Sequence, residues 1–454
     1  MTRSHAYRKV FTKTKFGTAE PLSFTIDHKL KRVLVGSRDS DALSALFMGK
    51  VLESGRSANI LDYDVYIDVK FPHVVGIFGS RGSGKSFDLG VFVEGLFLDE
   101  LMWGTPNSGQ AAIIFDIQDQ FWTLQHEPQA TIPQDASHRQ ALEKWGISPN
   151  SVNGLQIWIP NGSDTQVPNA RPLSLSPAQL TKADWLSILE LDRFSPMGQA
   201  LISLLENATD ATPAELVDRC SAGVLQNYQQ GTVDGLRWRL ISLQEAGVIN
   251  AEGLEVDQLL APGTLSVILM RNLHDSIRAL IVGVIARLVA DRMGRIQQAR
   301  KIALRTNTSM VDSEKLARRL WLVLDEAHVL VPSGASTPAT GPMIDYVKRG
   351  RDAGLSLVFA TQQPSAVDNR LMSQVDLTLT HTLGFEIDLS AATARMPTRT
   401  AVDYDIDSAR SPNIADVVRS LSPGEALVAD ASSGRVFLCH IRPRATAHGG
   451  NTPG

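Results

Sequence analysis

The amino-acid sequence predicts an α/β protein built on a mainly parallel sheet, preceded by a small β-rich unit and interrupted by a helical insertion. From about residue 72, apolar strand-like runs alternate with helical segments, and a glycine-rich loop joins the first such pair. Residues 125–260 break this alternation with polar loops and helical stretches. Strands that alternate with crossover helices form parallel sheets covered on both faces, which is the predicted architecture.

Length and composition indicate an ordinary globular protein. A chain of 454 residues exceeds what one small core organises, so two or three units are expected. The net charge of −4 provides no global basic field. This is only weak evidence against nucleic-acid binding, because a ring can concentrate positive charge in its pore. Two distant cysteines exclude a disulfide framework and a cysteine zinc site, and suit a reducing cytoplasm.

No segment reads as a targeting or membrane signal. Residues 1–17 are basic but lack the apolar stretch of a secretory signal. The most apolar long segment, residues 279–290, contains Arg287 and falls short of the roughly 20 residues of a membrane span. We therefore expect a soluble, cytoplasmic protein without a membrane partner.

The order of patterns predicts five segments. The first contains the strand-like runs 32–35 and 64–68, and the insertion contains the helical runs 182–191 and 196–205. The predicted units are a β-rich, barrel-like unit at 1–70, the first part of the α/β core at 71–125, a helical insertion at 126–260, the second part of the core at 261–400, and a C-terminal segment at 401–454 that includes a strand at 426–429.

The clearest motif is a complete G-x-x-x-x-G-K-[ST] loop between the strand 74–78 and the helical segment 87–98. Its glycines let backbone N–H groups turn inward toward phosphate oxygens, and the following helix presents its positive end. Lys85 can reach the β- and γ-phosphates of ATP, and Ser86 can ligate Mg²⁺. The predicted phosphate-binding residues are Gly79, Ser80, Arg81, Gly82, Ser83, Gly84, Lys85 and Ser86.

An acidic pair follows the apolar run 321–324. Asp325 would lie at the carboxyl end of a buried strand, where it can support Mg²⁺, and Glu326 can polarise the attacking water. The alternative is a helix N-cap followed by a first-turn acid. The complete loop upstream favours the catalytic interpretation.

Two further polar groups are candidates for contacts with the γ-phosphate. Gln362 follows the strand 355–360 and can bond the phosphate or the lytic water, although it can also lie in a solvent-facing turn before Pro364. Arg351 or Arg349 can stabilise charge on the γ-phosphate, in the same or a neighbouring subunit. Both arginines can instead simply offset the dipole of a helix that ends near Gly354.

Other patterns are weak. The ten histidines show no paired metal spacing, and we expect His328 to pack or hydrogen-bond locally. Residues 277–300 form a helix rich in arginine, typical of a solvated face, with a nucleic-acid or inter-subunit role as the alternative. No base-recognition motif of GTPases is found, which argues against a GTPase or metabolic kinase.

Together these motifs resemble the HerA/FtsK branch of P-loop ATPases, and HerA is the closer match. The resemblance is carried by GSRGSGKS, LDEAH, GRDAGLSL, ATQQP and the terminal RPRATAHGG. It implies a RecA-like core, with a small N-terminal barrel, in a homohexameric ring that moves double-stranded DNA using ATP and Mg²⁺, paired with a nuclease or another effector, including those of antiphage defence. By position, it makes Glu326 the catalytic base and Arg351 a functional arginine.

Three positions depart from the family pattern. Gln120 replaces an acid in the Asp116-x-x-Asp-Gln-Phe121 stretch, Gln363 replaces a common arginine, and His73 stands where an arginine often precedes the loop strand. The departures at Gln363 and His73 leave the source of a trans-acting arginine open. The competing hypothesis is therefore a nucleotide-gated scaffold that assembles and regulates a partner enzyme without processive DNA movement.

Overall fold

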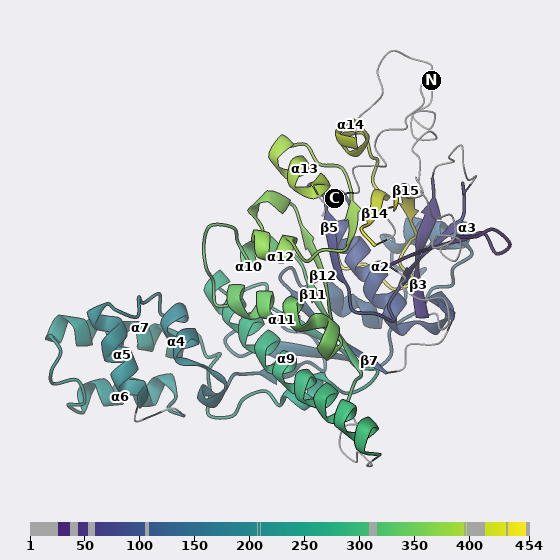
Figure 1. Cartoon of the computed structure of the whole chain (residues 1–454). Helices are drawn as coiled ribbons and strands as arrows, with labels where there is room; N and C mark the ends of the chain where they lie inside the picture. Colours follow the sequence, from purple (N-terminus) through teal and green to yellow (C-terminus); the bar gives the residue numbers. More distant parts are fainter. Residues whose placement is uncertain are drawn as a thin grey trace.

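A single large sheet organises the chain (Figure 1). The computed structural model describes residues 26–36, 44–52, 60–104, 109–206, 208, 210–307, 316–394, 396, 414–432 and 435–450. Within these residues the sheet has 15 strands in the order β1-β2-β4-β3-β15-β14-β13-β5-β12-β11-β7-β10-β8-β9, and β6 pairs with β3.

The strands from β13 to β9 in this order are all parallel. The central ones are apolar and buried along nearly their whole length, as expected for strands covered on both faces. This confirms the predicted α/β fold class. The strands are β13 (Leu377–Thr380), β5 (Val74–Phe78), β12 (Leu355–Thr361), β11 (Arg319–Leu324), β7 (Gln110–Asp116), β10 (Leu265–Leu269), β8 (Leu155–Pro160) and β9 (Arg171–Leu173).

The other half of the sheet is mostly antiparallel and joins the two ends of the chain. Here β15 (Arg435–Ile441) pairs with both β14 (Glu425–Asp430) and β3 (Ser44–Val51). The N-terminal strands are thus hydrogen-bonded to the core sheet. The remaining strands are β1 (Ile26–Asp27), β2 (Arg32–Val35), β4 (Asp64–Asp68) and β6 (Met102–Gly104).

The predicted division into five segments stays a prediction. Parts of it, including residues 1–25, 37–43, 53–59 and 397–413, lie outside the described residues. In the insertion predicted at 126–260, β8 and β9 extend the core sheet, so helices account for only part of that segment.

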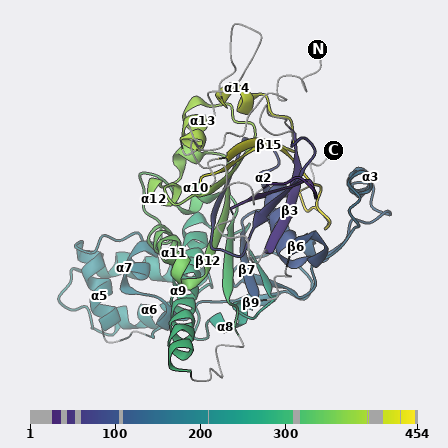
Figure 2. The same cartoon turned by 45° about the vertical axis from the view of Figure 1, so that its right-hand side comes forward.

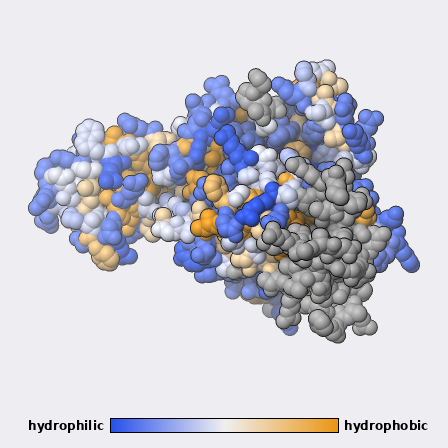
Figure 3. Space-filling view, turned by 90° about the horizontal axis from the view of Figure 1, so that it is seen from above, coloured by the Kyte–Doolittle hydropathy of each residue, from blue (hydrophilic) through white to orange (hydrophobic). Residues whose placement is uncertain are grey.

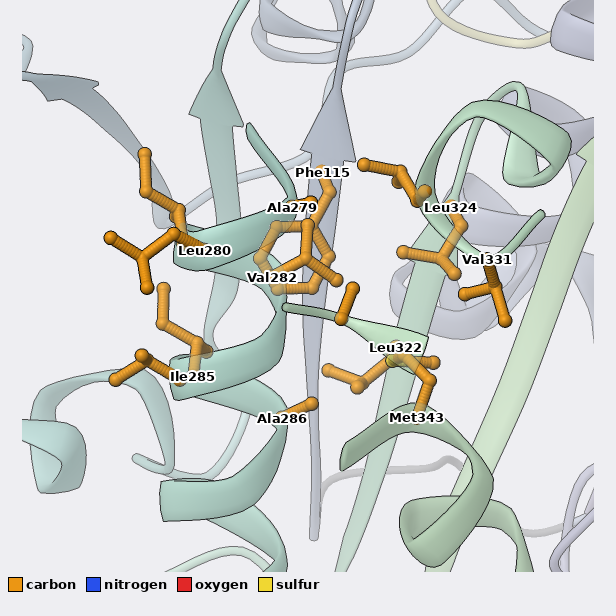
Figure 4. Close-up of a cluster of buried hydrophobic side chains, with 14 of the residues drawn as sticks. Phe115, Ala279, Leu280, Val282, Ile285, Ala286, Leu322, Leu324, Val331 and Met343 are labelled. Carbon is orange, nitrogen blue, oxygen red and sulfur yellow. The ribbon is translucent and has the colours of Figure 1, made fainter. Parts of the chain in front are cut away.

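Helices cover both faces of the parallel strands. Helix α2 (Lys85–Phe97) packs on one face, where Phe92 contacts Trp321 of β11 edge to face. The long helix α9 (Asp275–Thr306) and α11 (Thr340–Ala353) pack on the other face. In Figure 4, Ala279 and Val282 of α9 lie beside Phe115 of β7, and Met343 of α11 lies beside Leu322 of β11. This packing leaves the strand ends to carry polar groups.

A helical lobe projects to one side of the sheet, away from β3 and β15 (Figures 1 and 2). It comprises α4 (Lys182–Ile188), α5 (Pro196–Glu206), α6 (Pro213–Ser221) and α7 (Gln230–Glu245). Seen from above, its surface is largely hydrophilic with scattered hydrophobic residues (Figure 3). The N-terminal capping acid of α4, Asp184, forms an ion pair with Arg287 of α9 at 2.8 Å, which ties the lobe to the core.

Shorter helices connect these elements. They are α3 (Asp135–Trp145), α8 (Val256–Leu259), α10 (Ala327–Leu330), α12 (Asn369–Met372), α13 (Glu386–Thr393), α14 (Ile414–Arg419) and the 3₁₀ helices η2 (Asp99–Leu101), η3 (Phe121–Gln125), η4 (Pro177–Gln179) and η6 (Pro364–Ala366). Among the described residues, no helix has the length and apolar character needed to span a membrane.

Candidate nucleotide site

The glycine-rich loop leaves β5 at the carboxyl edge of the parallel sheet and runs directly into α2. Gly82 (φ 75°) and Gly84 (φ 111°) adopt left-handed backbone conformations that favour glycine. At Gly79 a side chain would collide with Ser83, because a Cβ there would lie 2.4 Å from Ser83 Oγ. These three glycines allow the tight curl expected of a phosphate cradle.

Lys85 lies at the start of α2 with its ammonium group folded back into the loop. Its Nζ donates a hydrogen bond to the Ser80 carbonyl at 2.9 Å. Burial lowers the pKa of Lys85, against the opposing effects of Glu326 and Asp325. A phosphate that enters the loop would take the place of this carbonyl as the partner of the ammonium group.

Ser86 and Asp325 meet although they are 239 residues apart. Ser86 Oγ donates to Asp325 Oδ2 at 3.1 Å, which brings together the two predicted metal-supporting residues. Asp325 is fully buried, and burial together with Glu326 raises its pKa to about 6. No group of three His, Cys, Asp or Glu side chains in the described part of the chain can hold a metal. A serine hydroxyl and one carboxylate are oxygen ligands that suit Mg²⁺ when phosphate and water complete its coordination.

Glu326 sits in the left-handed region at φ 50°, an unfavourable conformation for glutamate. It occupies the N-cap position of α10, but its side chain makes no capping hydrogen bond. Its Oε1 instead accepts from the Gln362 amide, and its buried Oε2 has no hydrogen-bond partner. The alternative of an acidic helix cap is therefore not what the geometry favours. Oε2 can therefore accept a hydrogen bond from a water.

Gln362 and His328 complete this cluster. Gln362 lies at a partly exposed bend after β12, and its amide donates to Glu326, so its side chain reaches the acidic pair. The His328 ring places Nδ1 3.1 Å from Thr361 Oγ1 and 3.5 Å from Glu326 Oε2, the local bonding expected for this residue. Burial lowers the pKa of His328, which favours its neutral form.

Arg351 lies at the opposite edge of the sheet. It is in the last turn of α11, immediately before β12, whereas Gln362 follows the far end of that strand. Seven extended residues span about 23 Å, more than an arginine side chain can reach. Arg351 therefore cannot contact a phosphate in its own loop. Arg349 instead forms an exposed ion pair with Asp291 at 2.7 Å.

Most of the arginines of α9 have intramolecular partners. Arg287 binds Asp184, Arg292 binds Asp257 at 2.7 Å, and Arg300 donates to the Leu316 carbonyl. These contacts agree with a structural face more than with a nucleic-acid surface.

Two of the residues that depart from the family pattern, His73 and Gln120, have partners within the chain. His73 is buried and pairs with Asp376 at 2.8 Å. Gln120 donates to Gln118, and its backbone packs against Gly449 of the C-terminal tail. Asp116, at the end of β7, accepts from the backbone of Gln118 and Phe121, and burial raises its pKa to about 7.

Sequence reasoning missed a buried anchor on α2. Glu94 accepts bonds from the Ala445 and Thr446 backbone, from Thr446 Oγ1 and from Arg442. These bonds hold the tail 442–450 against α2. There the ring of His448 contacts that of Phe87 edge to face, with 5.3 Å between the ring centroids. The sequence signal for this role is weak, because Glu94 is one of two acids, with Asp88, in a mainly apolar helix.

The comparison with protein families decides the assignment. The model of the central domain of helicase HerA matches residues 46–289, more than half of the chain. The chain belongs to the HerA family. A comparison with curated proteins finds no match.

Solved structures share the fold of this HerA-family chain. VirB4 of Thermoanaerobacter pseudethanolicus has a TM-score of 0.50 and 16% identity, and the match covers 89% of this chain and 98% of that one. Plasmid coupling protein TrwB in complex with ADP and Mg²⁺ has a TM-score of 0.51 and 14% identity, with 82% and 86% covered. TrwB with a non-hydrolysable ATP analogue scores 0.50 at 14% identity, with 84% and 88% covered. These likenesses support the RecA-like P-loop fold.

Proposed function

We propose that this chain is an Mg²⁺-dependent ATPase that forms a ring and moves along double-stranded DNA, together with a nuclease or another effector. The single observation that carries the proposal is the meeting of Ser86 with Asp325, and of Glu326 with Gln362, at the strand edge that bears the phosphate loop. Family membership and the nucleotide complexes of TrwB add support.

The chemistry follows from the positions of these groups. Lys85 and the loop N–H groups would hold the phosphates, while Ser86 and Asp325 would orient Mg²⁺, which neutralises developing charge. Glu326 Oε2 would accept a hydrogen bond from the attacking water and take its proton as the water oxygen bonds to the γ-phosphorus. The bond from that phosphorus to the β–γ bridging oxygen breaks in the same step, and ADP leaves with the bonding electron pair. Gln362 would fix the Glu326 carboxylate through Oε1 and so leave Oε2 to the water.

In a ring, a neighbouring subunit would supply the arginine that contacts the γ-phosphate. Because Arg351 lies at the amino edge of the sheet, it would act on the nucleotide of a neighbouring subunit whose carboxyl edge faces it. Such an arginine stabilises the transition-state charge and can accelerate hydrolysis by about 10³-fold or more. The site is therefore incomplete in one chain, and turnover should depend on assembly.

DNA movement can be tested by displacement of a third strand from duplex DNA. The full chain should release a bound third strand in the presence of ATP and Mg²⁺, and Glu326→Gln should not. If the chain hydrolyses ATP but displaces nothing, and a partner protein rather than DNA changes its rate, the nucleotide-gated scaffold becomes the better proposal.

A further inference from the structure

A buried histidine–aspartate bridge lies directly beneath the phosphate loop. His381 follows β13, and Asp88 belongs to the first turn of α2. His381 Nε2 and Asp88 Oδ2 are 2.8 Å apart, and each side chain is only 1% exposed. The hydrolytic steps described above use neither residue.

The protons of this bridge can be assigned from its partners. His381 Nδ1 lies 2.9 Å from the Glu425 carbonyl, which can only accept, so Nδ1 carries a hydrogen. The contact between Nε2 and Asp88 then needs one proton between the two atoms, carried by either. In both cases the bridge is neutral overall and links β14 to α2 through the imidazole ring.

The segment that carries His381 is hydrogen-bonded to the first end of the loop through its backbone. At the first end, the His381 amide donates to the Phe78 carbonyl at 2.8 Å. The neighbouring Thr382 carbonyl accepts from the Ser80 amide at 2.8 Å and from its hydroxyl at 3.0 Å. At the second end, Asp88 lies in the first turn of α2, which directly follows Gly84, so its contact with His381 attaches that turn to the same segment.

The imidazole also fills the space below the loop. A Cβ placed on Gly79 would lie 2.8 Å from His381 Cβ, and one on Gly84 would lie 3.9 Å from His381 Cε1. An acid in a first helical turn stabilises the helix by itself, but such an acid is usually solvated. Asp88 is instead buried and bonded to this one ring.

We propose that His381 and Asp88 are positioning residues of the phosphate loop. They hold the loop in its curled form before nucleotide arrives, so that its N–H groups converge on phosphate without a cost of ordering. This inference rests on the proposed function, because it assumes that the loop binds polyphosphate.

A second histidine–aspartate pair, next to strands β5 and β13, provides a control for the loss of such a pair. His73 precedes β5 and Asp376 precedes β13, and their pair at 2.8 Å lies at the other edge of the sheet. His73 is likewise buried, at 2% exposed, whereas the side chain of Asp376 is 22% exposed. Loss of this second pair should lower stability in a similar way without reaching the phosphate loop.

The test is equilibrium binding of inorganic tripolyphosphate and of ATP, each with Mg²⁺, to the full chain. We expect His381→Ala and Asp88→Ala to weaken the binding of both ligands by about tenfold. Asp88→Asn should bind like the wild type, because its amide can donate to an unprotonated Nε2. His73→Ala should lose melting temperature but keep wild-type affinity. If His381→Ala does not fold, His381→Gln should give a smaller loss in the same direction, because its side chain cannot bond Glu425 and Asp88 together.

Two outcomes would overturn the inference in distinguishable ways. Wild-type affinity in His381→Ala and Asp88→Ala, with melting temperatures lowered as in His73→Ala, would make the bridge purely structural. A wild-type chain that binds neither tripolyphosphate nor ATP would overturn the proposed function and this inference with it.

Discussion

At the residue scale, the carboxylate of Asp325, which we propose supports Mg²⁺, is held in an environment that disfavours its charge. Asp325 is fully buried, and its pKa is raised to about 6 from 3.8. Mg²⁺ requires the ionised carboxylate, so metal binding must release a proton below pH 6. We infer that the free-energy cost of ionising Asp325 in the folded chain is offset only when Mg²⁺ and nucleotide bind.

This environment makes stability without metal depend on pH. Between pH 4 and 6 the folded chain binds more protons at Asp325 than the unfolded chain, so the contribution of Asp325 to stability falls as pH rises through this window. Asp325→Asn removes the term. At pH 7 without Mg²⁺, the free energy of unfolding of Asp325→Asn should exceed that of the wild type by up to roughly 3 kcal/mol in denaturant unfolding. The greater stability of Asp325→Asn should vanish near pH 4. A free energy of unfolding below that of the wild type at pH 7 would contradict this view.

At the element scale, helix α11 and strand β12 determine where Arg351 can act. They place Arg351 and Gln362 at opposite edges of the sheet, so we expect Arg351 to serve a neighbouring subunit. Arg351→Ala and Glu326→Gln should each lose most ATP turnover. When the two inactive variants are mixed and reassembled, some interfaces combine an intact Arg351 with an intact Glu326, and part of the activity should return.

The controls for this experiment follow from the neighbouring arginine. Arg349 forms an exposed pair with Asp291, so Arg349→Ala should keep most of its turnover. If the mixture of Arg351→Ala and Glu326→Gln stays inactive although mixed rings form, action in trans is wrong.

The C-terminal strap gives a second prediction at this scale. Glu94 on α2 is the buried acceptor for Arg442 and for the tail, and Arg442 is also fully buried. Glu94→Ala would leave that charge uncompensated and should destabilise the chain by about 3–5 kcal/mol in denaturant unfolding. Glu143→Ala, an exposed acid on α3, should change stability by less than about 0.5 kcal/mol. A Glu94→Ala effect as small as this control would mean that the tail is not anchored there.

Local signals allowed the loop, the acidic pair and most of the core strands to be predicted. The run 74–78 coincides with β5, and the run 355–360 lies within β12, because buried parallel strands are mainly apolar. Strands β8 and β9 were missed. Strand β8 ends in Pro160, and the edge strand β9 contains exposed Arg171 and Pro172, so neither shows a continuous apolar pattern.

The supporting residues could not be predicted because their partners are distant in sequence. Asp88 and His381 are 293 residues apart, and Glu94 and Arg442 are 348 residues apart. No local spacing predicts such a pair. The position of Arg351 likewise became clear only from the direction of β12, which excludes the same-subunit alternative.

At the scale of the whole molecule, the residues of the proposed site lie at two opposite edges of the sheet. The carboxyl edge of the parallel strands carries Lys85, Asp325 and Glu326, and the amino edge carries Arg351. A ring in which one edge faces the other would complete every site, and DNA in its pore could then couple to turnover.

The most direct measurement is the ATPase rate of the full chain and of Glu326→Gln, with and without linear double-stranded DNA, at low and moderate salt. We expect DNA to stimulate the wild type several-fold, with a stimulation that declines steeply as salt rises, and we expect no turnover from Glu326→Gln. Wild-type hydrolysis that is indifferent to DNA at both salt concentrations would contradict a DNA-translocating motor.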